Sequence, residues 1–240
     1  MRPESGSPPL VFISGGTGYL GSALIPALLQ RGCRVRALAR PHSRARAMAQ
    51  LPAAVDIVEG DPLDARSIAR AAAGADTFVQ MVGVARPNPS KAREFLDIDL
   101  AAAEAGLDAA VVAGVPHLVY VSVSQFPDGR IPAMRAYVQS RAAAEEKIRQ
   151  RVATGGLSAT FVRPWYVLGP GHRWPLLLQP LLALAAWFPG QRERIEKMGL
   201  VTREAFTDAM LHAIAHPPAD IHVIDVAGIR RISRFARSLV

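Results

Sequence analysis

The segment from Leu10 to Gly21, LVFISGGTGYLG, limits the folds open to this chain more than any other part of the sequence. Its first five residues, Leu10 to Ser14, are mostly apolar and predict a short buried strand. Glycines follow at every third position, and an apolar helical periodicity begins at Tyr19. In a strand, turn and helix of this kind, the glycines permit a tight turn and the close approach of a ligand. The N–H groups at the start of the helix favour phosphate. The segment therefore predicts a site for a dinucleotide.

The glycine spacing, GxxGxxG, resembles the signature of the extended and atypical short-chain dehydrogenase/reductases, a group that includes NmrA-like proteins and an accessory subunit of respiratory complex I. It differs from GxGxxG, and no Gly-Lys-Ser/Thr follows as in a Walker loop. The resemblance extends from Leu10 to about Val226 and implies a Rossmann fold. It assigns the cofactor pyrophosphate to Gly15, Thr17, Gly18, Tyr19, Leu20 and Gly21.

Size and composition predict a globular α/β protein. The chain has 240 residues, of which 50% are hydrophobic. Predicted strands and helices alternate with short connections, which is typical of a doubly wound parallel sheet. We expect a single domain over 1–240, with a short lid or substrate region at about 165–200 and a basic tail at 228–240. Further helices are expected over Ala65 to Ala73, Lys91 to Ala113 and Thr202 to Ala215, with a last strand over Ile221 to Val226.

The cellular context is read from features that are absent. The polar N-terminus has no long apolar core, so we expect no signal peptide and a cytoplasmic protein. Cys33 is the single cysteine, which excludes an internal disulfide and predicts a buried structural thiol. The six histidines lack ligand spacing, and we propose no metal site. Although the net charge is +8, no nucleic-acid recognition motif accompanies it, so we expect no nucleic-acid partner.

The end of the second predicted strand, Cys33 to Ala39, indicates which cofactor is bound. An acidic residue about 20 positions beyond the glycines would bind the ribose hydroxyls of NAD, whereas arginine accommodates the 2′-phosphate of NADP. This chain has Arg40 there, followed by Ser43 and Arg44. A guanidinium suits a phosphate, so NADP(H) is favoured over NAD(H). The alternative is a solvated basic start to a helix.

Two further segments carry cofactor residues by resemblance. After the third predicted strand, Val55 to Gly60, the family places an acidic residue and its neighbour beside the adenine, here Asp61 and Pro62. After the fourth, Asp76 to Val82, a small-residue loop lies beside the cofactor, here Val82 and Gly83. Asp64 precedes a helical stretch and is expected to be its N-cap.

Two serines, a tyrosine and an arginine follow the fifth predicted strand, His117 to Val123. Strand alternation places Ser122 and Ser124 on one side if the extended geometry continues that far. Tyr137 and Arg141 are four residues apart in a helical stretch and therefore share one helix face. In the family, a serine, a tyrosine and a lysine four residues after the tyrosine form the reducing site.

Position 141 departs from this pattern, because the sequence has YxxxR in place of YxxxK. The resemblance implies that Tyr137 exchanges a proton with the substrate oxygen and that a serine orients the carbonyl. It also implies that the residue at 141 favours the ionised phenol and holds the nicotinamide ribose. Arg141 can act electrostatically, but it cannot lose its proton or reproduce an ammonium point charge. The site is either a working one that contains arginine or a lapsed one that only binds the cofactor, and Tyr137 could also be an ordinary helix tyrosine.

The C-terminal third carries a further cofactor segment and two surfaces. The pair Arg163-Pro164, after a strand predicted at Ser158 to Val162, resembles the segment that passes the nicotinamide, so Pro164 is assigned to the cofactor. The segment 174–189, WPLLLQPLLALAAWFP, is too short to span a bilayer. It is a lid over an apolar substrate, an interfacial helix on a membrane or partner, or a buried helix. The tail at 228–240 is basic and amphipathic, which fits a membrane or partner surface or a helix that covers the domain.

Two hypotheses follow. The first is an NADP(H)-dependent oxidoreductase acting on a small or apolar carbonyl or alcohol, with Tyr137, Arg141 and a serine at its site. The second is a catalytically silent NADP(H)-binding redox sensor or accessory subunit. It would dock on a membrane or protein partner through 174–189 and 228–240.

Overall fold

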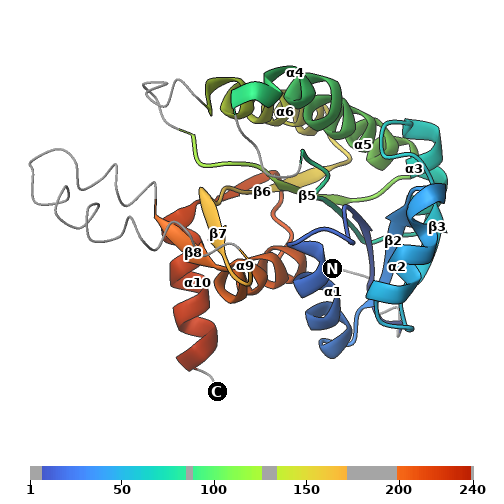
Figure 1. Cartoon of the computed structure of the whole chain (residues 1–240), viewed down its shortest axis with the longest axis horizontal. Coiled ribbons are helices and arrows are strands. Elements are labelled where there is room, and N and C mark those ends of the chain that lie inside the picture. The colour runs from blue at the N-terminus through green and yellow to red at the C-terminus, as the bar shows by residue number, and fades with distance from the viewer. Residues whose placement is uncertain (1–6, 85–88, 126–133, 172–198, 239–240) are drawn as a thin grey trace, which may run out of the picture.

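The computed structural model of the chain describes residues 7–84, 89–125, 134–171 and 199–238. At its centre lies a seven-stranded sheet with the order β3-β2-β1-β4-β5-β6-β9, in which all neighbouring strands are parallel (Figure 1). The strands are β1 (Leu10–Ser14), β2 (Arg34–Ala39), β3 (Asp56–Glu59), β4 (Thr77–Gln80), β5 (His117–Val121), β6 (Ser158–Val162) and β9 (Ile221–Ile224). The predicted doubly wound Rossmann fold is confirmed.

Helices cover both faces of the sheet, and alternation along β1 shows why. Val11 and Ile13 belong to one apolar cluster, whereas Leu10 and Phe12 belong to the other. The first cluster holds residues of α1 (Gly21–Gln30), α2 (Arg44–Gln50), α9 (Arg203–Ala215) and α10 (Val226–Ser238). The second holds residues of α3 (Ala65–Ala72), α5 (Ala101–Val112) and α6 (Arg135–Ala153). Because the sheet is covered on both faces, its central strands are buried along their whole length and are mostly apolar.

The order of the strands reverses at β1, which lies in the interior of the sheet between β2 and β4. The chain runs from β1 outward to β2 and β3, and then returns to place β4 on the other side of β1. Val11 is therefore paired with Val35 of β2 on one side and with Thr77 of β4 on the other. In open α/β sheets, ligands bind beyond the carboxyl ends of the strands at such a reversal. The fold thus directs attention to the loops after β1 and β4.

The region predicted as one helix from Lys91 to Ala113 is more complex. It comprises the short turns η2 (Pro89–Lys91) and α4 (Ala92–Glu94), a π-helical turn η3 (Phe95–Leu100), and α5. A π-helical turn changes the register of a helix and often occurs at functional sites. Within η3, both Phe95 and Asp99 are buried.

A second, two-stranded parallel sheet joins β7 (Tyr166–Leu168) to β8 (Leu200–Thr202) and was not predicted. Trp165, directly before β7, is partly buried against the apolar cluster that contains α9. The predicted lid segment, 174–189, lies outside the described residues, so its three interpretations stay open.

The basic C-terminal helix begins earlier than expected, at Val226. Ile229 is fully buried and Ile232 partly buried in the cluster that contains α9, so much of its apolar face is used within the fold. Phe235, however, is 66% exposed. None of the helices that the structure describes is both long and apolar enough to cross a membrane. Docking of this helix on a membrane or partner stays a prediction.

Candidate functional site

The loop after β1 is packed against the backbone after β4, and glycine is required for this contact. Gly15 has a φ of +85°, and a Cβ atom there would lie 2.8 Å from the carbonyl carbon of Met81 and 3.0 Å from the nitrogen of Val82. At Gly21, a Cβ atom would lie 2.5 Å from the carbonyl oxygen of Gly16. A side chain at position 15 would therefore force the two loops apart, and one at position 21 would displace the turn after β1. The structure thus brings the predicted cofactor residues Gly15 and Val82 together.

No side chain caps the start of α1. Leu20 occupies the N-cap position and provides no side-chain hydrogen bond to the helix. The turn is closed by its own backbone, with the Gly18 N–H donating to Gly15 O at 3.0 Å. The Ser22 N–H donates to Gly18 O at 3.0 Å and the Ala23 N–H to Leu20 O at 3.2 Å, so the first turn of α1 is closed by backbone alone. A helix start that no side chain caps is where this kind of fold binds a pyrophosphate. Thr17 is half-buried in this turn.

Tyr19, the aromatic residue of the glycine motif, contacts the C-terminal part of the chain. The guanidinium carbon of Arg203, at the start of α9, lies 5.5 Å from the centroid of the Tyr19 ring. The Tyr19 hydroxyl is so close to Gly169 that a Cβ atom there would overlap it. Burial raises the pKa of Tyr19, and the nearby Arg203 opposes this shift. The cofactor loop is thereby linked to the segment after β7.

The basic residues after β2 differ in their environment. Arg40 is exposed and forms no ion pair with any residue of the described ranges. Arg44, in contrast, is paired with Glu59 at the end of β3, with 3.1 Å between Nη1 and Oε1. Ser43 lies between them and is half-buried. Of the two predicted phosphate-binding arginines, Arg40 is therefore the one whose charge is not offset by a carboxylate.

The turn after β3 is organised by its acidic residues. The Asp61 carboxylate accepts a hydrogen bond from the Leu63 N–H at 2.9 Å, across the half-buried Pro62. Asp64 accepts one from the Arg66 N–H at 3.0 Å and is the N-cap of α3, as predicted. Asp61 is an exposed residue at the place where the adenine was predicted, while its backbone N–H donates to the Ser67 hydroxyl at 3.2 Å.

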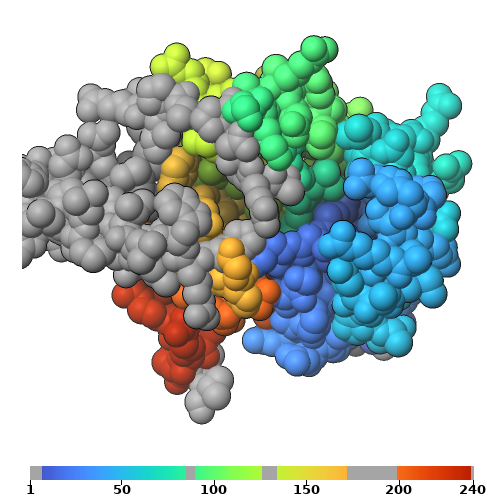
Figure 2. All heavy atoms as spheres, viewed as in Figure 1, coloured from blue at the N-terminus to red at the C-terminus, as the bar shows by residue number. Residues whose placement is uncertain are grey.

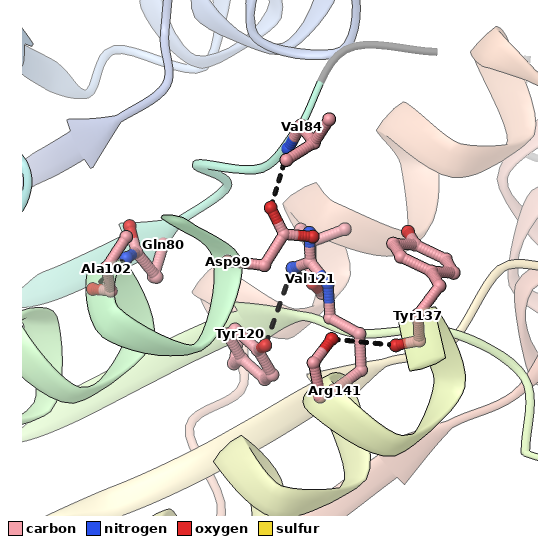
Figure 3. A network of polar contacts seen from close by, with 9 residues as sticks. Gln80, Val84, Asp99, Ala102, Tyr120, Val121, Tyr137 and Arg141 are labelled. Atoms are coloured by element: carbon pink, nitrogen blue, oxygen red, sulfur yellow. Dashed lines mark hydrogen bonds and ion pairs between the residues drawn. The ribbon is translucent and has the colours of Figure 1, made fainter. Parts of the chain in front are cut away.

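Tyr137 and Arg141 lie together on α6, as their spacing predicts. The guanidinium carbon of Arg141 is 5.4 Å from the centroid of the Tyr137 ring. Phe95 of η3 packs edge-on against the same ring, with 5.2 Å between the centroids. In Figure 3, the Tyr137 ring stands beside the guanidinium, with its hydroxyl at the end far from the helix backbone. Tyr137 is half-buried.

Arg141 is held by three elements of the protein. Its Nη2 pairs with Asp99 Oδ2 at 2.9 Å, and its Nη1 donates to the carbonyl of Val121 at 2.9 Å and to the Tyr120 hydroxyl at 3.4 Å (Figure 3). Its Nε has no hydrogen-bond partner among the residues that the structure describes. The guanidinium is thus a buried brace between η3, β5 and α6.

The loop after β4 lies directly against this brace. The Val84 N–H donates to Asp99 Oδ1 at 2.6 Å. A Cβ atom at Gly83 would overlap Nη2 of Arg141. The predicted cofactor residue Gly83 and the predicted catalytic residue Arg141 are therefore in contact, and any larger residue at 83 would displace the guanidinium.

The ionisable groups of this network shift in directions set by burial and by one another. Burial raises the pKa of Asp99, while Arg141 and the Val84 N–H oppose this shift. Burial works to lower the pKa of Arg141, but Tyr120, Tyr137 and Asp99 outweigh it and raise the pKa. Burial likewise raises the pKa of Tyr120. Arg141 is therefore a permanent cation and cannot relay protons.

The two predicted serines lie just beyond β5. Ser122 is buried, its N–H donates to Val162 O at 2.8 Å, and its hydroxyl has no hydrogen-bond partner within the described part of the chain. The Ser124 N–H donates to Pro164 O at 3.0 Å, which joins the predicted catalytic serine to the predicted nicotinamide segment. In Figure 2, the N-terminal part of the chain (blue), its central part (green) and the segment around β7 (orange-yellow) lie next to one another on the face turned to the reader.

Arg163, the residue before Pro164, has a structural role. Its Nε donates to Glu145 Oε1 of α6 at 2.8 Å, and its Nη2 contacts the second oxygen. Arg149 is also paired with this carboxylate, at 3.6 Å. The pair fixes α6, and with it Tyr137, against the end of β6.

Sequence reasoning missed Asp99, Tyr120 and Glu145. Asp99 was hidden in an alanine-rich helical region, although its spacing from Phe95 places it on an apolar face, which is a signal for a paired carboxylate. No cluster of His, Cys, Asp and Glu suited to a metal occurs in the described ranges.

Comparisons with known proteins place this arrangement in context. The family described as NAD(P)H-binding matches residues 15–173 of the chain. Ceramide reductase from Caulobacter vibrioides is 31% identical over 180 residues, which are 75% of this chain and 53% of that protein. Sterol demethylase protein B from Methylococcus capsulatus is 29% identical over 184 residues, which are 69% of this chain and 54% of that protein. The chain therefore spans about half the length of these curated relatives.

Solved structures resemble the fold over nearly the whole chain. MoeE5, solved in complex with UDP-glucuronic acid and NAD, superposes with a TM-score of 0.66 at 21% identity, covering 90% of this chain and 75% of that one. A UDP-N-acetylglucosamine 4-epimerase from Bacillus cereus gives a TM-score of 0.66 at 14% identity, covering 94% and 81%. At these identities the likeness concerns the fold alone.

Proposed function

Because the chain belongs to the NAD(P)H-binding family, in the short-chain dehydrogenase/reductase class, we propose that it is an NADP(H)-dependent oxidoreductase for an apolar carbonyl or alcohol. The observation that carries this proposal is the position of Tyr137. Its ring lies beside Arg141, and Arg141 in turn contacts Gly83 of the loop after β4, next to the strand reversal. A phenol is thus held near the loops that bind a dinucleotide in this fold.

The residues present suit the cofactor. The backbone from Gly15 to Gly21 and the start of α1, which no side chain caps, would hold the pyrophosphate. Asp61 and Pro62 would border the adenine, and Val82, Gly83 and Pro164 the nicotinamide. A bound nicotinamide would supply or accept the hydride. The unpaired position of Arg40 supports a preference for the 2′-phosphate of NADP(H).

The chemistry assigned to this chain is a proton transfer. The Tyr137 hydroxyl would donate its proton to the substrate oxygen during reduction and recover one from solvent afterwards. Ser124 would orient the carbonyl from the end of β5, where its backbone is fixed to Pro164. Arg141 remains charged throughout and favours the ionised phenol without itself exchanging a proton.

The cofactor preference is tested by calorimetric titration with NADPH and, separately, NADH. We expect Arg40→Ala to weaken NADPH binding about 10- to 100-fold, since a charge-assisted hydrogen bond contributes about 1.5–3 kcal/mol. NADH binding should not change. The matched control is Arg31→Ala, which removes an exposed arginine at the C-terminal end of α1, away from the predicted pyrophosphate turn. Equal affinity of the wild type for both cofactors would contradict the NADP(H) assignment.

The substrate class is supported by the relatives, which are named for ceramide and sterol chemistry. We expect oxidation of NADPH with apolar ketones, such as a 3-keto lipid or a 3-ketosteroid in detergent micelles, and little with a small water-soluble ketone. Tyr137→Phe should abolish turnover while NADPH affinity is retained. Turnover that survives this substitution would refute the role of Tyr137.

The silent alternative is distinguished by the same assay. The comparisons do not favour it, because relatives are named as reductases. A protein that binds NADPH tightly but oxidises it with no ketone of either class would instead favour the alternative of a redox sensor or accessory subunit.

A further inference from the structure

Asp99 is a buried carboxylate for which the proposed reaction has no use. It is 1% exposed, and both of its oxygens are engaged. Oδ1 accepts the Val84 N–H at 2.6 Å, and Oδ2 pairs with Arg141 Nη2 at 2.9 Å. A buried carboxylate is costly unless it is paired and hydrogen-bonded, so the two partners are the reason that Asp99 can be charged there.

The two partners of Asp99 belong to different parts of the site. Val84 continues the loop in which Gly83 is predicted to border the cofactor, whereas Arg141 lies on the helix of Tyr137 (Figure 3). Asp99 itself belongs to the π-helical turn η3 and is buried, and it bonds to both of these partners. One carboxylate thus joins the cofactor loop to the helix of the proton donor.

Asp99 also determines the charge that Tyr137 experiences. The guanidinium carbon of Arg141 is 5.4 Å from the centroid of the Tyr137 ring, a distance at which its positive charge acts on the phenol. The carboxylate at 2.9 Å from this guanidinium offsets that effect. Among the residues that the structure describes, the other titratable groups facing the pair are Tyr120 of β5 and Glu94 of α4.

We propose that Asp99 is a positioning residue of the reducing site, which holds Arg141 against the cofactor loop and offsets its charge at Tyr137. This inference rests on the proposed function, in which Tyr137 is the proton donor. It makes Arg141 a charge-balanced brace, fixed by the protein and not available to the cofactor ribose.

The test is a titration of tyrosine ionisation by ultraviolet absorbance, in each variant with and without Tyr137→Phe, so that the difference reports Tyr137 alone. Asp99→Asn keeps the size of the side chain and an oxygen acceptor for Val84 but removes the charge. We expect it to move the midpoint of the Tyr137 titration about one unit toward lower pH. The matched control is Asp97→Asn in the same turn, whose carboxylate is 62% exposed and should leave the midpoint unchanged.

A double variant separates charge from packing. Asp99→Asn combined with Arg141→Gln removes both charges and should return the midpoint close to that of the wild type. Arg141→Gln alone should move the midpoint toward higher pH, which provides a readout if Asp99→Asn does not fold. An unchanged midpoint in both single variants would overturn the inference, as would a double variant that does not return toward the wild type.

The readout is independent of turnover, so the two proposals fail separately. Absence of turnover with every ketone contradicts the proposed function, whereas the titration still decides the role of Asp99. In an active enzyme, Asp99→Asn should move the basic limb of the pH–rate profile for ketone reduction to lower pH, because the proton donor Tyr137 is then lost at a lower pH. A merely structural role would lower the rate equally at every pH.

Discussion

The contact between Gly21 and Gly16 gives a sharp prediction for the substitution Gly21→Ala. The new Cβ atom would lie 2.5 Å from the carbonyl oxygen of Gly16 and 2.6 Å from its Cα, both of which are backbone atoms. Neither can move without displacing the turn that follows β1. Overpacking of this kind costs about 1–3 kcal/mol. Alanine regains at most about 1 kcal/mol of helix propensity at the start of α1. The free energy of unfolding should therefore fall by about 1–2 kcal/mol.

Gly32→Ala is the matched control, because it strains the chain without any overlap. Gly32 follows α1 with a φ of +76°, and no atom lies within 4 Å of the point where a Cβ atom would be added. A left-handed conformation costs alanine about 1–2 kcal/mol, so the two variants should be destabilised to a similar extent. Only Gly21→Ala displaces the turn assigned to the pyrophosphate. It should therefore weaken NADPH binding about tenfold or more, while Gly32→Ala leaves affinity unchanged.

The two variants are compared by urea unfolding, followed by circular dichroism, and by calorimetric titration with NADPH. A Gly21→Ala variant as stable as the wild type would show that the helix moves freely away from Gly16. Equal loss of NADPH affinity in both variants would show that the effect follows stability alone. Either result would refute the reasoning from this contact.

Three further predictions concern single side chains. Glu145→Ala should lower the free energy of unfolding by about 3–5 kcal/mol, because the partly buried Arg163 loses its carboxylate partner, which is only 2% exposed. The control Glu146→Ala, at an exposed position, should lower the free energy of unfolding by less than about 0.5 kcal/mol. Burial lowers the pKa of His212 from 6.5, so the unfolded chain takes up this proton first and the free energy of unfolding falls as the pH decreases below 6.5. Urea unfolding from pH 7 to 5 should show a smaller fall in His212→Gln and no difference in the exposed His42→Gln. Burial raises the pKa of the Cys33 thiol, so a disulfide reagent at pH 8 should modify the native protein more slowly than the urea-unfolded chain, and equal rates would contradict this.

The central strands were predictable because their sequence pattern is simple. A parallel sheet covered on both faces requires continuous apolar runs, and the predicted strand Leu10–Ser14 agrees with β1 at both ends. The pairing of β7 with β8 was not predictable, because each is a three-residue strand and the partners are far apart in sequence. Local patterns carry no information on such a long-range contact.

The candidate site was predictable where it depends on one element and unpredictable where it joins several. The spacing of Tyr137 and Arg141 on one helix fixed their mutual position. The role of Asp99 was not found in this way, because its partners Val84 and Arg141 lie on other elements that no local pattern joins to it. The result is that the local chemistry of YxxxR was visible in the sequence, but the carboxylate that balances it was not.

The network also predicts the outcome of Arg141→Lys, which would restore the family pattern of YxxxK. The guanidinium bonds at once to Asp99, to the Val121 carbonyl and to the Tyr120 hydroxyl through two different nitrogens. A single ammonium cannot occupy both positions of that planar fork, so either the carboxylate or the carbonyl loses its donor. A buried acceptor left without a partner costs about 1–3 kcal/mol. Urea unfolding should therefore show Arg141→Lys to be less stable than the wild type by this amount. Turnover should not rise, because the lysine can keep only one of these two acceptors and the contact with the other is lost. A stable, faster Arg141→Lys variant would show instead that the arginine fork is dispensable and that the site still accepts the lysine of its family.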